Sequence, residues 1–143
     1  MNYLKIRIGT PYSRSKGGKR EDLNNQYFRS AWEANYARYL NWLKAQGEIK
    51  DWRFESKTFE FETIKRGSRF YTPDFEVVNK DNSLEYHEVK GYMDTVSATK
   101  LKRMSKYYPN VKIVLIDKDA YAAIAKSIRA FIPNWESNRH KAY

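Results

Sequence analysis

Two apolar stretches separated by a short polar segment constrain this sequence more than any other feature. Residues 70–78 and 84–89 are each long enough for a β-strand and apolar enough to be partly buried. The segment between them, NKDNS, is rich in the residues that form turns. The pattern predicts a β-hairpin within the central sheet of the fold.

The register of this hairpin decides which of its side chains meet. A three-residue loop at 80–82 would pair Asn79 with Ser83. Counting back along both strands then places Asp74 opposite Glu88. Residues directly opposite on antiparallel strands share a face, with Cβ atoms about 4.5–5.5 Å apart. A loop one residue longer or shorter would turn the two carboxylates to opposite faces, so the prediction depends on an odd-numbered loop.

Two carboxylates that face each other repel, and this repulsion favours a cation between them. Lys90 lies two residues after Glu88 and therefore on the same face, about 7 Å away. Oxygen ligands in a chain without Cys favour a hard divalent cation, Mg²⁺ or Mn²⁺. Lys90 can orient a water held by such an ion or offset charge on a phosphate. The alternative is that Asp74 is only a turn residue after a proline, and that Glu88 and Lys90 form an exposed ion pair.

Two other titratable residues of the hairpin are expected to be structural. His87 alternates to the face opposite Glu88, and the chain has only two His, so a mechanism driven by histidine is not expected. Glu76 shares the face of Asp74, where an ordinary surface residue is a better explanation than an accessory metal ligand.

The charge of the chain indicates a polyanionic partner, of which nucleic acid is the commonest. There are 27 Lys+Arg against 17 Asp+Glu, a net charge of +10 over 143 residues. Basic residues occupy a predicted flexible loop at 11–25 and a predicted helix at 94–108. An ordinary solvated surface is the alternative for all of them. The candidates for contacts with DNA phosphates are Lys100, Lys102, Arg103, Lys106, Lys16, Lys19 and Arg20.

Apolar periodicity predicts the remaining elements. Helices are expected at 27–46, 94–108 and 121–131, and strands at 4–8, 52–54, 59–61 and 111–116, besides the hairpin. The order α-β-β-β-α-β-α predicts an α/β sandwich, with a central mixed sheet flanked by helices. The length fits one domain, residues 1–143, with a basic N-terminal strand and loop (1–26), a core (27–132) and a polar, frayed tail (133–143).

Several classes of protein are excluded by composition. No run of 18 apolar residues predicts a membrane span, and the N-terminus lacks the layout of a signal peptide. Without Cys there is no disulfide framework and no thiolate metal site. These features predict a cytoplasmic protein without a membrane partner.

The hairpin also carries a resemblance to a known family. Pro73-Asp74, thirteen residues, and then Glu88-Val89-Lys90 resemble the signature of the PD-(D/E)XK nuclease superfamily. The predicted order of helices and strands over residues 29–116 is similar to that superfamily too. Within it, the chain most resembles small phage endonucleases of the junction-resolving endonuclease I type. This resemblance implies a restriction-endonuclease-like fold and, if the chain is phage-encoded, a place in the host cell cytoplasm.

The resemblance also implies a chemistry for the hairpin. Such enzymes hydrolyse phosphodiester bonds with Mg²⁺ and leave a 5′-phosphate, and their substrates include branched DNA, such as Holliday junctions, and double-stranded DNA. Asp74 and Glu88 would bind the metal, and the carbonyl of Val89 would add a ligand. Lys90 would lie beside the water that attacks the phosphate.

A further acidic residue often lies on the first helix of such nucleases, and Glu33 matches that place. Helical spacing that continues upstream through Phe28 favours this role in the metal site. The alternative is a capping box that begins at Ser30, in which Glu33 bonds back to a backbone N–H.

The sequence therefore predicts a Mg²⁺-dependent endodeoxyribonuclease. A homodimer would give one site per DNA strand, and the strand expected at 4–8 is a candidate pairing element. Two alternatives stay open: a non-catalytic nucleic-acid-binding module that keeps the nuclease fold, and a basic RNA-associated protein.

Overall fold

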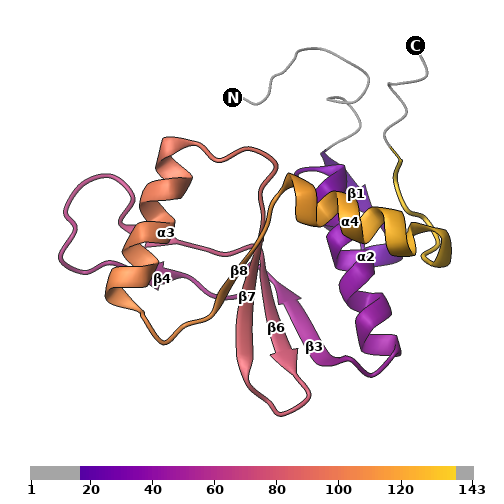
Figure 1. Cartoon of the computed structure of the whole chain (residues 1–143). Coiled ribbons are helices and arrows are strands. Elements are labelled where there is room, and N and C mark those ends of the chain that lie inside the picture. Colours follow the sequence, from indigo (N-terminus) through magenta and orange to yellow (C-terminus); the bar gives the residue numbers. More distant parts are fainter. Residues whose placement is uncertain (1–16, 138–143) are drawn as a thin grey trace. The chain divides into compact units, whose positions relative to one another are not determined.

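The computed structural model describes residues 17–137, which form a mixed α/β fold with a central mixed sheet and three α-helices (Figure 1). The predicted fold class is confirmed in these terms. The chain divides into two units, one ending at Trp42 and resuming at Tyr121, the other spanning Leu43–Ala120. The strand expected at 4–8 and Lys16 lie outside the described residues. Within the described part of the chain, no helix has the length and apolar character needed to cross a membrane.

The central sheet belongs to the unit Leu43–Ala120 and contains both strands of the predicted hairpin. Its order is β3 (Ile49–Phe54), β6 (Phe75–Asn79), β7 (Leu84–Val89) and β8 (Ile113–Ile116). β6 pairs antiparallel with both β3 and β7, whereas β7 and β8 are parallel. A parallel pair needs a crossover connection, which α3 (Thr95–Tyr107) supplies.

The strand expected at 70–78 is two strands in the structure. β5 (Phe70–Tyr71) pairs with β4 (Phe59–Glu60) in a separate two-stranded sheet, and β6 begins only at Phe75. Pro73 stands between them, and a proline cannot donate the N–H that a continuous strand would need. The interruption places Asp74 directly before the hairpin strand.

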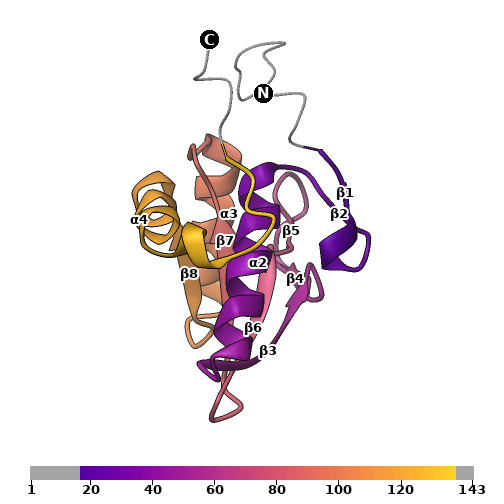
Figure 2. The same ribbon diagram turned by 90° about the vertical axis from the view of Figure 1, so that its right-hand side faces the viewer.

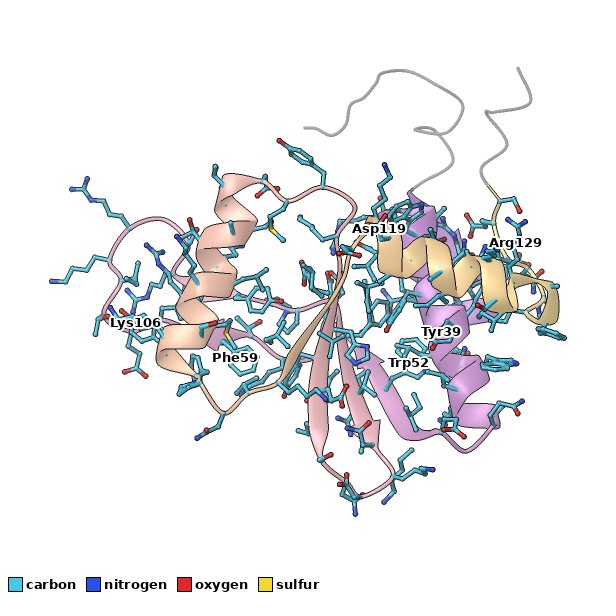
Figure 3. All side chains as sticks on the ribbon, in the orientation of Figure 1. Tyr39, Trp52, Phe59, Lys106, Asp119 and Arg129 are labelled. Carbon is cyan, nitrogen blue, oxygen red and sulfur yellow. The ribbon has the colours of Figure 1, made fainter. Side chains whose placement is uncertain are left out.

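Aromatic side chains pack α3 onto the two-stranded sheet and the hairpin. Phe59, Tyr71 and Tyr86 form a buried cluster with Met104 of α3. Phe59, which Figure 3 labels beside α3, meets the ring of Tyr86 edge to face, with 5.2 Å between centroids. Such pairs add to the free energy gained by burial of the rings, so this cluster holds α3 in place.

The other unit contains elements that the sequence did not predict. β1 (Gly18–Arg20) and β2 (Gln26–Phe28) pair antiparallel and lie side by side in Figure 2, and the 3₁₀-helix η1 (Glu21–Leu23) follows β1 in the chain. The prediction of a loop is therefore wrong for residues 18–23, and residues 24–25 form the turn that leads into β2. Most of α2 (Ala31–Ala45) and of α4 (Lys118–Ile128) belongs to this unit, as does the 3₁₀-helix η2 (Arg129–Phe131).

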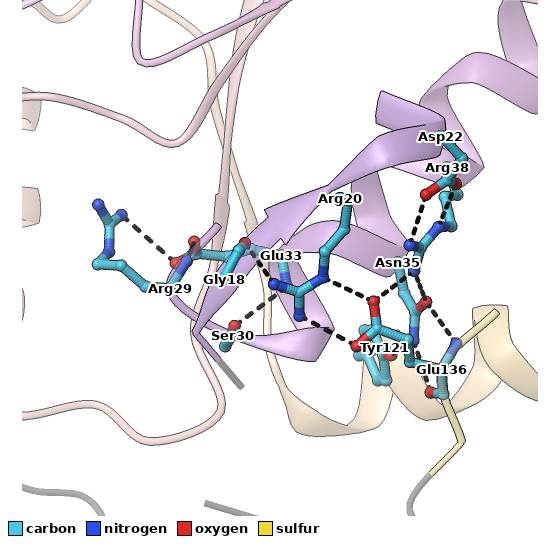
Figure 4. Close-up of polar contacts among 10 residues, drawn as sticks. All are labelled: Gly18, Arg20, Asp22, Arg29, Ser30, Glu33, Asn35, Arg38, Tyr121 and Glu136. Carbon is cyan, nitrogen blue, oxygen red and sulfur yellow. Dashed lines mark hydrogen bonds and ion pairs between the residues drawn. The ribbon is translucent and has the colours of Figure 1, made fainter. Parts of the chain in front are cut away.

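A buried polar network anchors the segment predicted to be a frayed tail (Figure 4). The Glu136 carboxylate accepts hydrogen bonds from Arg20 Nε and from Arg38 Nη1, each at 2.8 Å. The side chain of Asn35 exchanges two further bonds with the backbone of Glu136 and donates to the Tyr121 hydroxyl at 2.9 Å. The chain is thus held at residue 136, three residues beyond the predicted start of the tail.

We expect Glu136→Gln to lower the free energy of unfolding by about 1–3 kcal/mol, because two buried guanidinium groups lose a shared carboxylate. Glu62→Gln is the matched control, since Glu62 is exposed and the same change there should stay within about 0.5 kcal/mol. Urea denaturation at pH 7 measures both differences.

The effect of Glu136→Gln should also depend on pH. Burial by itself would raise the pKa of Glu136, but hydrogen bonds from Arg20 and Arg38 hold this pKa below its ordinary value of 4.5. A lowered carboxyl pKa stabilises the fold above the unfolded pKa, and the contribution is lost as pH falls through the folded pKa. The difference from wild type should therefore be full at pH 7 and shrink below about pH 4.5. A constant difference down to acid pH would contradict a role for the charged carboxylate.

Candidate active site

A three-residue loop closes the hairpin, as predicted. Asn79 donates its N–H to the carbonyl of Ser83 at 2.8 Å, so residues 80–82 form the loop. Asn82 has a φ of 70°, a left-handed conformation that Asn tolerates better than most residues. The Asp81 carboxylate accepts the N–H of Ser83 at 2.9 Å. These turn residues determine the odd loop length on which the register depends.

The register brings Asp74 and Glu88 together. The last pair of the two strands is Phe75 with His87, and one further step places Asp74 opposite Glu88, as predicted. The N–H of Asp74 donates to Glu88 Oε1 at 3.3 Å, and Asp74 Oδ2 accepts the N–H of Val89 at 2.8 Å. Asp74 is only 4% exposed, so its bond to the strand backbone fixes the position of its carboxylate.

Glu88 and Lys90 line one pocket of about 120 Å³. The two side chains that were predicted to share a face thus meet at one pocket, with Lys90 in the position directly after β7 ends at Val89. The remaining lining residues are Tyr71, Thr72, Met93, Ser97, Lys100 and Leu101. The pocket therefore combines a carboxylate, hydroxyl groups and two ammonium groups, a set that suits a phosphate together with a hard cation.

Tyr71 is a site residue that the sequence did not indicate. Its hydroxyl donates to Glu88 Oε1 at 3.1 Å, the oxygen that also accepts the N–H of Asp74. Burial of the ring, and then the charge of Glu88, raises the pKa of Tyr71 far above its ordinary value, so the phenol stays protonated and donates. Two donors thus orient the Glu88 carboxylate. The position of Tyr71 follows from the pairing of β5 with β4, for which the only sequence signal is a short apolar stretch.

Lys90 is held at the pocket from two sides. The backbone N–H of Lys90 donates to the carbonyl of Ile116 at 2.9 Å. The ammonium of its side chain lies 3.7 Å from Asp94 Oδ2. Asp94 also caps α3, because its Oδ1 accepts the N–H of Ser97 at 2.7 Å. This N–H, helped by the charge of Lys90, holds the pKa of Asp94 below its ordinary value.

Glu76 is buried, not at the surface as expected. It lies opposite both Arg53 and Tyr86, and it accepts hydrogen bonds from both side chains. Burial, and then this bond to Glu76, raises the pKa of Tyr86 to about 12. Glu76 is thus a structural residue of the sheet.

The predicted metal ligands are the carboxylates of Asp74 and Glu88 and the carbonyl of Val89. In residues 17–137, no group of three or more His, Cys, Asp or Glu side chains is arranged to hold a metal ion. Two neighbouring carboxylates nevertheless fit Mg²⁺, because this ion takes one or two carboxylates and keeps several waters. The assignment of Mg²⁺ or Mn²⁺ stays a prediction.

Glu33 belongs to the other unit and makes the contacts of a helix cap (Figure 4). Ser30 Oγ accepts the N–H of Glu33 at 3.1 Å, and Glu33 Oε1 accepts the N–H of Arg29 at 3.2 Å. The helix begins at Ala31, and Phe28 belongs to a strand, so the argument from continued helical spacing is wrong. The capping alternative describes these contacts, and a role for Glu33 as a metal ligand stays a prediction.

The four residues of α3 that were predicted to contact phosphates have different surroundings in the structure. Lys100 lines the pocket, whereas Lys102 and Lys106 (labelled in Figure 3) are exposed on the helix. Arg103 donates to the carbonyl of Ser68 at 2.8 Å and so holds the loop between β4 and β5.

Basic residues outside α3 also differ from the prediction. Lys19 is exposed on β1, but Arg20 is only 8% exposed and bonds to Glu136. The structure therefore gives Arg20 a structural role in place of the predicted DNA contact. The loop between β4 and β5 adds Lys65 and Arg66, both exposed. The sequence did not indicate them, because tertiary contacts bring this loop to α3, among them those of Arg103 with Ser68 and of Thr63 with Tyr107.

The cap at Asp94 yields a prediction that separates its two contacts. Asp94→Ala should lower the free energy of unfolding by about 1 kcal/mol, because α3 loses its cap. Asp94→Asn should stay within about 0.5 kcal/mol, since Asn caps as well as Asp and an exposed ion pair contributes little. Urea denaturation at pH 7 compares the two. Equal losses would mean that the ion pair with Lys90, not the cap, carries the stability.

One comparison with known proteins gives a match. A family model with the description "Protein of unknown function (DUF1064)" matches residues 14–122, which are 109 of the 143 residues. The matched region contains Asp74 and every residue that lines the pocket. No curated protein and no solved structure matches the chain. The chain therefore belongs to the DUF1064 family.

Proposed function

We propose that the protein is a metal-dependent DNA endonuclease of the PD-(D/E)XK superfamily. One observation carries the proposal: Asp74 lies opposite Glu88, and Lys90 lines the same pocket as Glu88. Apart from β4 and β5, which form a separate small sheet, the element order is α2, β3, β6, β7, α3, β8, and it supports the proposal because the resemblance to these nucleases implies this order.

Residues in the pocket and next to it have separate roles in this proposal. Asp74, Glu88 and the carbonyl of Val89 would hold Mg²⁺, which when bound stabilises charge on the phosphate and lowers the pKa of a water. Tyr71 keeps the Glu88 carboxylate in one orientation. The ammonium of Lys90 offsets negative charge that develops on the phosphate and orients the attacking water.

The distribution of charge supports DNA as the substrate. The net charge is +10, and exposed cations lie on α3 and on the loop between β4 and β5. Such contacts position the DNA backbone without reading its sequence. Branched or double-stranded DNA, cut to leave a 5′-phosphate, is the substrate that the resemblance implies. A homodimer with one site per strand is part of the proposal, and light scattering at working concentration tests it.

The central test is cleavage of plasmid and four-way-junction DNA in Mg²⁺. Asp74→Asn, Glu88→Gln and Lys90→Met should each lower the cleavage rate by about 10²-fold or more, because each removes a charge from the reacting centre. Glu85→Gln is the matched control. Glu85 lies on the same strand but alternates to the opposite face, so this variant should cleave like wild type.

Four outcomes would contradict parts of this proposal or of the predicted metal site. Wild-type rates for Asp74→Asn or Lys90→Met would refute the catalytic assignment. Wild-type protein that binds DNA in EDTA but never cleaves it in Mg²⁺ would favour the non-catalytic module, and a preference for RNA would favour the RNA-associated protein. For Glu33→Gln, unchanged activity with reduced stability would leave Glu33 only the role of a cap.

Tyr71→Phe tests the orientation of Glu88. The variant keeps the buried ring but removes one hydrogen bond to the carboxylate, so kcat should fall about 5- to 10-fold while the Kd for DNA is unchanged. Tyr86→Phe removes the equivalent bond to Glu76 outside the pocket and should keep the wild-type kcat. Equal effects of the two variants would mean that both act through stability alone.

A further inference from the structure

An exposed apolar patch follows the candidate site directly along the chain. Tyr92 is 74% exposed, Val96 56% and Met93 37%, and we call these three residues the rim patch. They lie on the segment that joins β7 to α3 and on the first turn of α3 (Figure 1). Single exposed apolar residues are common on protein surfaces, whereas three within five consecutive residues make this segment a candidate binding surface.

The rim patch borders the pocket that contains Glu88 and Lys90. Met93 itself lines this pocket, together with Lys100. Tyr92 is the neighbour of Met93 in the chain, so its Cα lies about 3.8 Å from that of a residue lining the pocket. A tyrosine exposed to solvent thus directly precedes a residue that lines the pocket together with the two lysines.

We propose that the rim patch binds the base of an unpaired nucleotide in the DNA substrate, with Tyr92 stacking on it. The inference rests on the proposed function, which places a phosphate in the pocket beside Lys90 and Lys100. Sites for single strands combine cationic groups for the backbone with aromatic side chains on which bases stack. The pocket and the rim patch have these two chemistries side by side.

The requirement for an unpaired base follows from the structure of DNA. Inside a duplex, away from its ends, every base is stacked on both neighbours, and the faces that an aromatic side chain would contact are covered. Tyr92 gains a stacking partner only where a nucleotide has left the stack. The substrate class is therefore DNA with an unpaired nucleotide next to the cleaved phosphodiester, as at a single-stranded overhang or an open branch point.

Charge favours DNA over a protein partner for this surface. The segment from Lys90 to Lys100 has one acidic residue, Asp94. Its carboxylate accepts the N–H of Ser97 and lies 3.7 Å from the Lys90 ammonium, so it adds little repulsion toward a phosphate. A cationic pocket beside an aromatic ring is complementary to a nucleotide, which has an anionic end and a flat apolar end.

The test compares binding of two DNAs by the full chain in EDTA, where no metal-dependent cleavage occurs. One is a blunt duplex and the other is the same duplex with a short single-stranded overhang. Fluorescence anisotropy gives the Kd for each at several salt concentrations. We expect Tyr92→Ala to weaken binding of the overhang DNA by about 5- to 100-fold and to change binding of the blunt duplex less than about 2-fold.

Further variants identify the interaction. Tyr92→Phe keeps the ring and should bind like wild type, whereas Tyr92→Leu keeps an apolar side chain without the ring and should bind like Tyr92→Ala. Leu84→Ala is the matched control, since Leu84 is an exposed apolar residue at the loop end of the hairpin, away from Glu88. It should leave both Kd values unchanged.

Salt dependence separates stacking from phosphate contacts. Tyr92→Ala removes no charge, so the slope of log Kd against log salt should stay that of wild type. Lys100→Ala removes one cation and should reduce this slope by about 0.7–0.9 for both DNAs. A slope changed by Tyr92→Ala would overturn the assignment of stacking.

Three other results would overturn the inference. Wild-type binding of the overhang DNA by both Tyr92→Ala and Val96→Ala would leave the rim patch to a protein partner. Equal weakening for the blunt duplex would remove the requirement for an unpaired base. A changed mass of Tyr92→Ala in light scattering would assign the patch to contacts between copies. The binding test is done without Mg²⁺, so its result does not depend on cleavage. Failure of the nuclease proposal would be seen in the cleavage test instead, where the wild-type protein would not cut DNA in Mg²⁺.

Discussion

The register between β6 and β7 is the constraint on which the candidate site depends. Side chains alternate along a strand, so a slip of one residue would separate Asp74 from Glu88 and turn Lys90 away from the pocket. The register is set at the far end of the hairpin, where Asn82 takes a left-handed conformation and Asp81 bonds to the backbone of Ser83. A turn of three residues thus determines which charged groups meet several residues away.

Around this register, short elements hold each polar group of the site. β5 brings the Tyr71 hydroxyl to Glu88, and the cap of α3 brings Asp94 to the ammonium of Lys90. A charged group at the edge of the core requires a polar partner. Tyr71 is such a partner for Glu88, and Asp94 is one for Lys90. In our proposal the same arrangement leaves a pocket whose carboxylate and cations suit a metal ion and a phosphate, with Tyr92 at its rim.

Local patterns predicted the centre of the fold better than its N-terminal part. β7, α3 and β8 appear within two residues of their expected bounds, because apolar periodicity, a capping Asp94 and a stop at Pro109 are local signals. The first helix was predicted four residues too long at its start. Phe28 lies four residues before Trp32, a helical spacing by coincidence, and the cap at Ser30 decides the boundary instead.

The sequence by itself determined the hairpin, its loop length and the convergence of Asp74 with Glu88, since turn chemistry and the alternation of a strand act over a few residues. Only the tertiary structure decided that Tyr71 orients Glu88 and that Arg20 is buried against Glu136 rather than exposed. The physical reason is separation along the chain. Contacts between residues 17 or 116 positions apart depend on how elements pack, and no local pattern of residue types encodes that packing.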